Sequence, residues 1–172
     1  MSCLLVTPLS QLNDAIALHR PSLVVTLLSP EHMIETPDGF PAERHLRLGV
    51  NDIVDPAAGT HPPDAGHIER LLAFTRTWDG EAPLLIHCWA GISRSMASAF
   101  TVLCDRLGPE REAAIAQGMR RRAPHAAPNK LLVSYADAVL NRGGRMLAAL
   151  DSMGPPLVME EGVTTDFPLV DL

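Results

Sequence analysis

The sequence predicts a three-layer α/β/α fold around a central, mostly parallel sheet of about four or five strands. Short runs of apolar and β-branched residues alternate along the chain with longer segments of helical periodicity. Two of the short runs, 22–28 and 83–87, are almost wholly apolar, which is typical of strands buried on both faces. The chain has 172 residues, 47% of them apolar, which suits one domain with its own core and is too short for two.

The first segments of the chain predict a strand followed closely by a helix. Residues 2–6 are a short apolar run that fits the first strand. Thr7 and Pro8 have the character of an N-cap and a first helical residue, so we expect a helix from this point to about His19. After the strand at 22–28, a further strand is expected at 44–50, where polar and apolar residues alternate as in a half-buried strand.

The middle of the chain predicts a loop, two helices and the strand between them. Residues 51–63 are rich in Asp, Gly and Pro, which indicates a loop. A helix is expected at about 64–78, where apolar residues recur at helical spacing. After the strand 83–87, a helical pattern begins near Arg94 and continues to Leu107, where Gly and Pro end it.

The rest of the chain predicts more helices and then an irregular end. Three helices fit 109–122, 128–141 and 144–153. The last 19 residues contain three prolines but also several apolar residues. We therefore expect residues 1–153 to form one folded domain and residues 154–172 to form a C-terminal tail that packs on the domain or on a partner.

Composition and charge exclude several classes of protein. The net charge of −6 argues against a nucleic-acid binder, which usually carries a basic face. No apolar stretch approaches the roughly 20 residues that span a bilayer, and the N-terminus lacks the features of a secretory signal. The three cysteines fit neither a disulfide framework nor a zinc site. We expect a reduced, cytoplasmic domain, and the excess of Arg over Lys suggests a GC-rich, bacterial genome.

The segment 86–95, IHCWAGISRS, carries the residues from which we predict chemistry. The predicted strand ends near Cys88 and is followed by a tight turn, in which Gly91 allows a positive φ. A helix is expected to begin near Arg94. Backbone N–H groups of such a turn form an anion site at the helix N-terminus, and Arg94 can hold two phosphate oxygens. The same positive field favours the thiolate form of Cys88. Ser95 adds a hydroxyl that can donate to this sulfur.

The residues from His87 to Ser95 match H-C-x-x-G-x-x-R-S and resemble the signature of the cysteine-dependent protein tyrosine phosphatases, in particular the compact dual-specificity type. The resemblance covers about residues 2–152. It implies a protein tyrosine phosphatase-like fold and an enzyme that needs no cofactor and no metal. It implies catalytic roles for Cys88, Arg94 and Ser95, and a supporting role for His87. The phosphate-binding loop would consist of Cys88, Trp89, Ala90, Gly91, Ile92, Ser93 and Arg94.

The phosphatases that this motif resembles use an Asp about 30–40 residues before the cysteine as general acid. Asp52 and Asp55 lie 36 and 33 residues before Cys88. We favour Asp52, because it follows the predicted strand 44–50 directly and matches an Asn-Asp pair found at that place in compact dual-specificity phosphatases. Asp55, which precedes a proline and so lies in an extended or turn conformation, is the alternative general acid.

The resemblance implies a phosphorylated protein or a small phosphomonoester as substrate, with phosphate or sulfate able to occupy the loop. No variable loop position is basic, which disfavours phosphoinositides and RNA 5′ ends. Trp89 suits a hydrophobic leaving group or packs beneath the loop. The short chain predicts a shallow site, so phosphoserine and phosphothreonine are expected beside phosphotyrosine, with no nucleic acid or membrane as a partner. The alternatives are a phosphate-binding module that has lost turnover and a rhodanese-like sulfur carrier.

Two further features leave alternatives open. The arginines 120–122 form either a site for a second anion or the solvated end of a helix. Cys104 is either an inert core residue or a resolving thiol for oxidised Cys88, and the role of Cys3 is open too. In each of these cases we expect peroxide to inactivate Cys88 reversibly.

Overall fold

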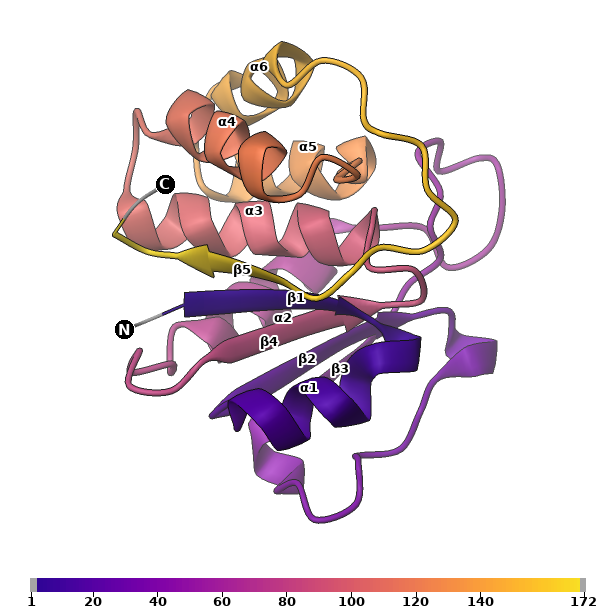
Figure 1. Ribbon diagram of the computed structural model, residues 1–172. Helices are drawn as coiled ribbons and strands as arrows, with labels where there is room; N and C mark the ends of the chain where they lie inside the picture. The colour runs from indigo at the N-terminus through magenta and orange to yellow at the C-terminus, as the bar shows by residue number, and fades with distance from the viewer. Residues whose placement is uncertain (1–2, 171–172) are drawn as a thin grey trace.

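The computed structural model describes residues 3–170, which form a five-stranded sheet between helices (Figure 1). Its strands are β1 (Cys3–Pro8), β2 (Leu23–Leu28), β3 (His45–Gly49), β4 (Leu84–Cys88) and β5 (Thr165–Pro168). They lie in the order β3-β2-β4-β1-β5. The first four strands run parallel to one another, and β5 pairs antiparallel with β1. The predicted α/β/α fold with a mostly parallel sheet is confirmed.

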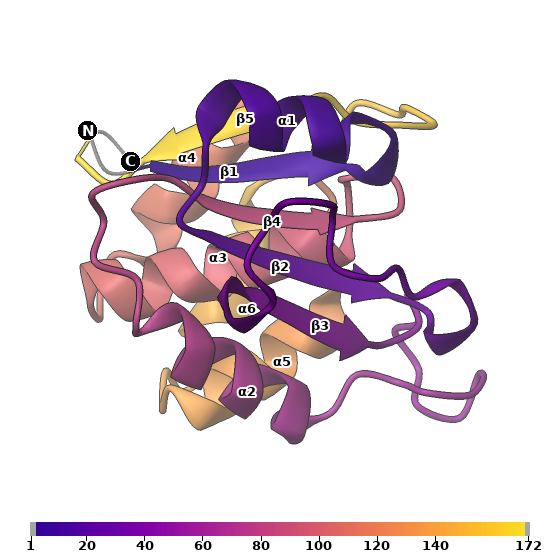
Figure 2. The ribbon, with the colours of Figure 1, turned by 90° about the horizontal axis from the view of Figure 1, so that it is seen from below.

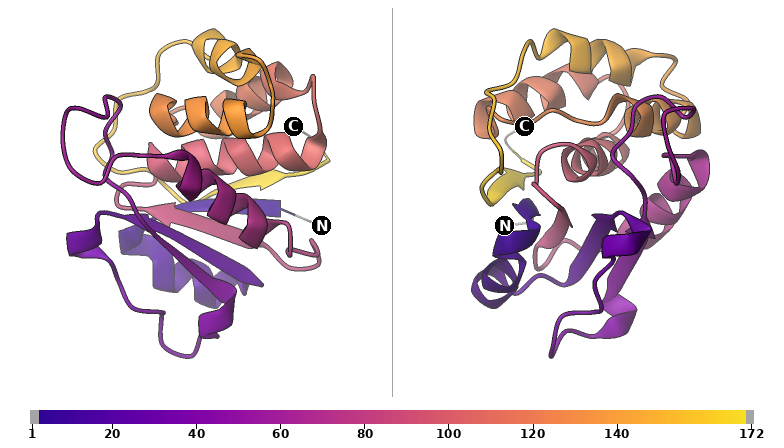
Figure 3. Two further views of the ribbon diagram at one scale, coloured as in Figure 1. Left: turned by 180° about the vertical axis from the view of Figure 1, so that it is seen from behind. Right: turned by 90° about the vertical axis from the view of Figure 1, so that its right-hand side faces the viewer.

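Helices enclose the sheet on both faces (Figures 2 and 3). They are α1 (Leu12–His19), α2 (Ala65–Thr75), α3 (Arg94–Leu107), α4 (Glu112–Arg122), α5 (Lys130–Val139) and α6 (Arg145–Ser152). Helix α1 covers one face, where Leu12 and Ala15 pack with Leu5, Val24 and Leu85. Helices α2 and α3 cover the other face; α4 and α5 pack on α3, and α6 lies against both of them. Within residues 3–170, no helix has the length and apolar character needed to cross a membrane.

The central strands β2 and β4 supply side chains to both layers of the core, because neighbouring residues of a strand point to opposite faces. Every residue of these two strands is buried. Leu23, Val25 and Leu27 join the larger core under α2 and α3, whereas Val24 joins the smaller core under α1. Burial on both faces is the reason for their continuous apolar sequence. Strand β3 lies at the edge of the sheet; its His45 and Leu48 are buried, whereas Arg47 is exposed.

The first helix begins later than the sequence predicts. Thr7 and Pro8 are the last residues of β1, where they pair with His87 and Cys88 of β4. A 3-10 turn, Leu9–Gln11, then leads into α1. The prediction of an N-cap at Thr7 and a first helical residue at Pro8 is therefore wrong, because pairing with β4 extends the strand by two residues. A proline is tolerated there, since the ladder ends at this residue.

The C-terminal segment runs back across the molecule after α6, shown in yellow in Figure 1. Its end forms β5, whose Phe167 is fully buried against the sheet. Nη2 of Arg120 at the end of α4 donates to the carbonyl oxygen of Gly154, and Arg122 forms an ion pair with Asp166. Two of the three consecutive arginines thus hold this segment in place. The domain boundary after residue 153 stays a prediction.

Candidate active site

The sheet places Cys88 at its centre, at the C-terminal end of β4 (Figure 1). Parallel strands direct their carboxyl ends to one edge of a sheet, and ligands of open α/β proteins bind at this edge. Cys88 is buried, and the chain passes from it through residues 89–93 into α3 at Arg94. The sulfur of Cys88 lies 3.1 Å from Oγ of Ser95 in the first turn of α3. This hydroxyl can donate a hydrogen bond to a negatively charged sulfur.

Gly91 lets the loop 88–94 pass close against β1. Its φ is 69°, a left-handed conformation that glycine adopts without a steric penalty. A Cβ atom at this position would lie 2.8 Å from the backbone nitrogen of Pro8 and 3.0 Å from the carbonyl carbon of Thr7. On the same side, the backbone N–H of Leu9 donates to the carbonyl oxygen of residue 89 (3.0 Å). The loop is therefore held against the end of β1, and a glycine is the residue that fits.

Arg94 is a buried cation at the start of α3. Its Nη1 donates to the carbonyl oxygen of Val50, which directly follows β3 (2.9 Å). Its Nε is buried and has no hydrogen-bond partner among residues 3–170. A buried N–H without an acceptor costs about 1–3 kcal/mol, and an anion held at this helix N-terminus would supply the acceptor. The guanidinium and the loop together fit a phosphate group.

Asp52 contacts the loop through Ser93. Its Oδ1 accepts hydrogen bonds from Oγ of Ser93 (2.7 Å) and from Nδ2 of Asn129 (2.8 Å). Because both contacts fall on Oδ1, the second carboxyl oxygen is left to carry or accept a proton. The structure thus brings the favoured general-acid candidate to the rim of the loop.

Asp55 lies elsewhere. Its side chain is exposed and accepts a hydrogen bond from the backbone N–H of Ala57 within its own turn (2.9 Å). A carboxylate that caps its own turn is a common feature of loops of this composition. Asp55 therefore has a local contact that explains it, whereas Asp52 reaches across to the loop.

Asn129 is a site residue that the sequence does not single out. Its Oδ1 accepts a hydrogen bond from the backbone N–H of Leu132 (2.9 Å) and so caps α5. Its Nδ2 donates to Asp52, and its backbone N–H donates to the carbonyl oxygen of Ser93 (3.3 Å). An Asn before a helical pattern is a recognisable N-cap signal. No local pattern, however, indicates a contact with a residue 77 positions earlier.

His87 supports the loop from inside the protein. It is fully buried; its Nδ1 lies 3.4 Å from the carbonyl oxygen of Cys88, and its Nε2 lies 2.6 Å from Oγ1 of Thr26. Burial is the main cause that lowers the pKa of His87 to about 4, and the nearby His45 and Arg94 lower it further. His87 is therefore neutral at pH 7, and hydrogen bonding is the way in which it acts on its neighbours.

A cavity of about 250 Å³ lies beside Arg94 and is also lined by Leu28, Ser29, His32 and Trp89. The side chain of Trp89 is 56% exposed. Its ring meets that of His32 edge-on, with 5.6 Å between the ring centroids. The alternative in which Trp89 packs beneath the loop is therefore wrong, and the indole instead forms an aromatic wall beside Arg94.

Two later segments of the chain support the loop. The backbone N–H of Ala127 donates to the carbonyl oxygen of Ile92 (3.0 Å), and that of Gly162 donates to the carbonyl oxygen of Ala90 (2.8 Å). Gly162 packs closely on the buried His125, since a Cβ atom at this glycine would lie 2.8 Å from Nε2 of the ring. Burial lowers the pKa of His125, as does the charge of Arg120.

The other two thiols are poor nucleophiles. Cys104 is fully buried in α3, and burial is the main cause that raises the pKa of its thiol, followed by the charge of Glu112. Burial and Asp166 raise the pKa of Cys3 as well. Both thiols are therefore protonated at pH 7, which favours the interpretation of Cys104 as an inert core residue.

Comparison with known proteins gives likeness in structure but not in sequence. No family model matches the chain, and no curated protein matches it. Among solved structures, DUSP15 superimposes with a TM-score of 0.61 over 89% of each chain, at 15% identity. The Yvh1 phosphatase domain from Chaetomium thermophilum gives 0.58 at 20% identity, over 83% of this chain and 93% of that domain.

A third neighbour is the human tyrosine phosphatase-like serine/threonine/tyrosine-interacting protein. It superimposes with a TM-score of 0.59 at 19% identity, over 79% of this chain and 89% of the other. At such low identity, the likeness is one of fold. The chain has a protein tyrosine phosphatase-like fold, which it shares with these three structures.

Proposed function

We propose that this protein is a metal-independent phosphomonoesterase that acts on phosphotyrosine-like substrates, and on phosphoserine and phosphothreonine as well, through a cysteinyl-phosphate intermediate. One observation carries the proposal: Cys88 lies 3.1 Å from Ser95 in the first turn of α3, the helix that begins at Arg94, whose buried Nε has no hydrogen-bond partner among residues 3–170. A nucleophile, a donor to its sulfur and an unpaired cationic donor are thus combined in one anion site.

In the first step, the thiolate of Cys88 attacks phosphorus in line with the ester oxygen. The S–P bond forms and the P–O bond to the leaving group breaks. Asp52, in its protonated form, gives its proton to the departing oxygen. Arg94 and the N–H groups of the loop stabilise the equatorial oxygens, which is the main electrostatic contribution to phosphoryl transfer.

In the second step, a water molecule attacks phosphorus and breaks the S–P bond. Asp52, now a carboxylate, takes a proton from this water and returns to its protonated form. Inorganic phosphate leaves, and the electron pair returns to the sulfur of Cys88. The hydroxyl of Ser95, 3.1 Å from this sulfur, donates a hydrogen bond to the thiolate as it departs.

The aromatic wall beside Arg94 supports the choice of substrate. Trp89 and His32 can contact the apolar part of a phosphorylated residue, and a phenyl ring suits this contact best. The loop holds no basic side chain besides Arg94, so a single phosphate is favoured over a headgroup with several. Phosphorylated proteins and small phosphomonoesters are therefore the partners that we propose.

A phosphate-binding module without turnover is the second candidate. One structural neighbour is described as a phosphatase-like interacting protein, which keeps this candidate open. Both candidates predict binding of phosphate, sulfate or vanadate in the loop, so binding does not separate them. Turnover does.

Hydrolysis of p-nitrophenyl phosphate in the presence of EDTA tests the proposal, with wild type beside Cys88→Ser, Asp52→Asn and Asp55→Asn. We expect wild type to turn over and Cys88→Ser to be inactive. Asp52→Asn should lower kcat by about 10²–10⁴-fold and remove the basic limb of the pH profile, with Asp55→Asn as the matched control. If reduced wild type binds vanadate without turnover, the binding module is the better conclusion. If Asp55→Asn alone has the effect, Asp55 is the acid.

A further inference from the structure

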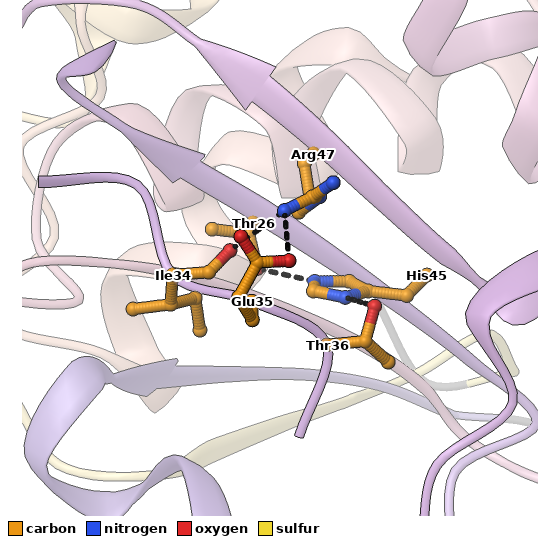
Figure 4. Close-up of polar contacts among 6 residues, drawn as sticks. All are labelled: Thr26, Ile34, Glu35, Thr36, His45 and Arg47. Atoms are coloured by element: carbon orange, nitrogen blue, oxygen red, sulfur yellow. Dashed lines mark hydrogen bonds and ion pairs between the residues drawn. The ribbon is translucent and has the colours of Figure 1, made fainter. Parts of the chain in front are cut away.

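A line of hydrogen bonds connects the strand of Cys88 with the segment between β2 and β3. Nε2 of His87 lies 2.6 Å from Oγ1 of Thr26, and the same hydroxyl lies 2.7 Å from Nε2 of His45. Nδ1 of His45 lies 3.0 Å from Oγ1 of Thr36. We name Thr26, His45 and Thr36 the relay, and Figure 4 shows the side chain of His45 in contact with those of Thr26 and Thr36.

The relay lies on the face of the sheet that α1 covers. Thr26 is two residues after Val24, and His87 is two residues after Leu85, so both follow residues that pack under α1. Thr26 and His87 are fully buried, and His45 is 8% exposed. Apolar side chains would fill this space without buried polar groups that need partners. The presence of three polar groups therefore points to a role beyond packing.

Both imidazole rings of this line are neutral at pH 7. Burial is the main cause that lowers the pKa of His45 to about 4, and the charge of Arg47 lowers it further. Burial is also the main cause that lowers the pKa of His87 to about 4, and the neighbouring His45 and Arg94 lower it further. A neutral imidazole has one N–H donor and one acceptor nitrogen, so each ring must adopt one tautomer.

Counting donors and acceptors assigns both tautomers. The carbonyl oxygen of Cys88 only accepts, so Nδ1 of His87 carries the hydrogen and Nε2 accepts from Thr26. The single hydrogen of this hydroxyl is then used, so Thr26 accepts from the Nε2–H of His45. Nδ1 of His45 in turn accepts from the hydroxyl of Thr36. Every donor in the line points towards Cys88.

We propose that Thr26, His45 and Thr36 are positioning residues for the nucleophile, which hold His87 in the tautomer that donates to the carbonyl of Cys88. This inference rests on the proposed function. The peptide group of Cys88 is the start of the phosphate loop, and its carbonyl dipole lies next to the sulfur. When Nδ1–H of His87 holds this carbonyl, the dipole stays turned away from a thiolate that it would otherwise repel.

The outer end of the relay is the part that can be changed most safely. Nη1 of Arg47 on β3 donates to the carbonyl oxygen of Ile34 (3.2 Å) and to Glu35 (3.0 Å), which keeps the neighbouring Thr36 against His45 (Figure 4). The Arg47–Glu35 ion pair is exposed, so it contributes little to the stability of the fold. A change at Thr36 therefore removes one relay hydrogen bond without opening the core.

Long-range ¹⁵N NMR of the histidine rings tests the assignment directly, without substrate. We expect the Nδ1–H tautomer at His87 and the Nε2–H tautomer at His45 in wild type at pH 7. Thr26→Val should produce a second tautomer at His87, whereas Thr26→Ser should keep the wild-type spectrum. The opposite tautomers in wild type would overturn the proposal.

The role of the relay is tested on the reactivity of Cys88. Alkylation by iodoacetamide, followed by mass spectrometry of the Cys88 peptide, gives its rate as a function of pH. We expect Thr26→Val to move the midpoint of this profile to higher pH and to lower kcat for p-nitrophenyl phosphate about tenfold, with less change in KM. Thr26→Ser should restore both, and Thr36→Val should act in the same direction with a smaller effect.

The outcomes separate this proposal from the proposed function. If folded Thr26→Val keeps the wild-type alkylation profile and kcat, the relay is only structural. If Thr26→Val does not fold, Thr36→Val and Thr36→Ser decide in the same way, and a wild-type profile for Thr36→Val overturns the proposal. If wild type hydrolyses no phosphomonoester, the proposed function fails, and the NMR and alkylation results still decide on the relay.

Discussion

Replacement of Gly91 by alanine probes the close approach between the loop 88–94 and β1. Gly91 has a φ of 69°, and a Cβ atom there would lie 2.8 Å from the backbone nitrogen of Pro8. Gly143, between α5 and α6, offers a matched control. Its φ is 61°, and no atom lies within 4 Å of the position that its Cβ would take. The two alanine variants therefore share the conformational strain and differ in the collision.

The magnitude of each effect follows from these two contributions. A left-handed conformation costs a non-glycine residue about 1–2 kcal/mol, which is the whole effect expected for Gly143→Ala. Gly91→Ala adds an overpacking cost of about 1–3 kcal/mol, because the atoms in the way belong to the backbone of β1 and cannot rotate aside. The expected loss of stability is thus about 2–5 kcal/mol for Gly91→Ala.

Urea unfolding and thermal melting measure the difference. At about 2–4 °C per kcal/mol for a chain of this length, Gly91→Ala should melt roughly 2–12 °C below Gly143→Ala. Activity adds a second readout, since relief of the collision must displace the loop: kcat should fall in Gly91→Ala and stay at the wild-type value in Gly143→Ala. Equal losses of stability in the two variants would refute the close approach as the reason for a glycine at position 91.

Acid should weaken the fold as the pH falls from 6.5 towards 4, because the unfolded chain protonates a histidine near 6.5 whereas the pKa of buried His87 is lowered to about 4. In urea unfolding at several pH values, His87→Asn should reduce this dependence by about 1.4 kcal/mol per pH unit. Asn129→Ala, which removes the cap of α5 and a hydrogen bond to Asp52, should lower stability by about 1–2 kcal/mol in the same assay. It should also lower kcat for p-nitrophenyl phosphate. Mild peroxide should inactivate the protein at Cys88, and dithiothreitol should restore activity equally in wild type and in Cys104→Ser.

Each of these outcomes has a clear opposite. An unchanged pH dependence in His87→Asn would mean that the ring takes up protons as readily in the folded state as in the unfolded chain. Full kcat in Asn129→Ala would show that Asp52 does not need this partner. Recovery that depends on Cys104 would show that this buried thiol reaches the oxidised Cys88. Such a result would contradict the expectation that a thiol with a raised pKa is unreactive.

The sequence predicted most of the elements because their signals are local. The strands at 22–28 and 83–87 and the helix beginning at Arg94 appear where the apolar pattern placed them. The segment after residue 153 shows the limit of such signals. Its four-residue strand β5 forms because β1 has a free edge on which Phe167 can be buried, and no pattern within the segment itself indicates that edge.

Thr7 and Pro8 illustrate the same limit at a shorter range. The order Thr-Pro fits the start of a helix, and nothing in the neighbouring sequence indicates that the strand continues through these two residues. Pairing with His87 and Cys88 overrides this preference. The ladder between β1 and β4 gives hydrogen-bond partners to backbone groups here, whereas the first N–H groups of a helix have no partner within the helix. Tertiary pairing thus decided where the first strand ends.

The loop from Cys88 to Arg94 was predictable from the sequence, because a thiol, a glycine and a cation lie within seven residues between a predicted strand and a predicted helix. The residues that complete the site come from distant segments and are brought to it by folding. Asp52 meets Asn129 across 77 positions, and Thr26 meets His87 across 61, since parallel strands and the loops at their ends bring together distant segments. Contacts between residues so far apart in the sequence produce no recognisable spacing within a motif. Their partners are determined only when the strands assemble into the sheet.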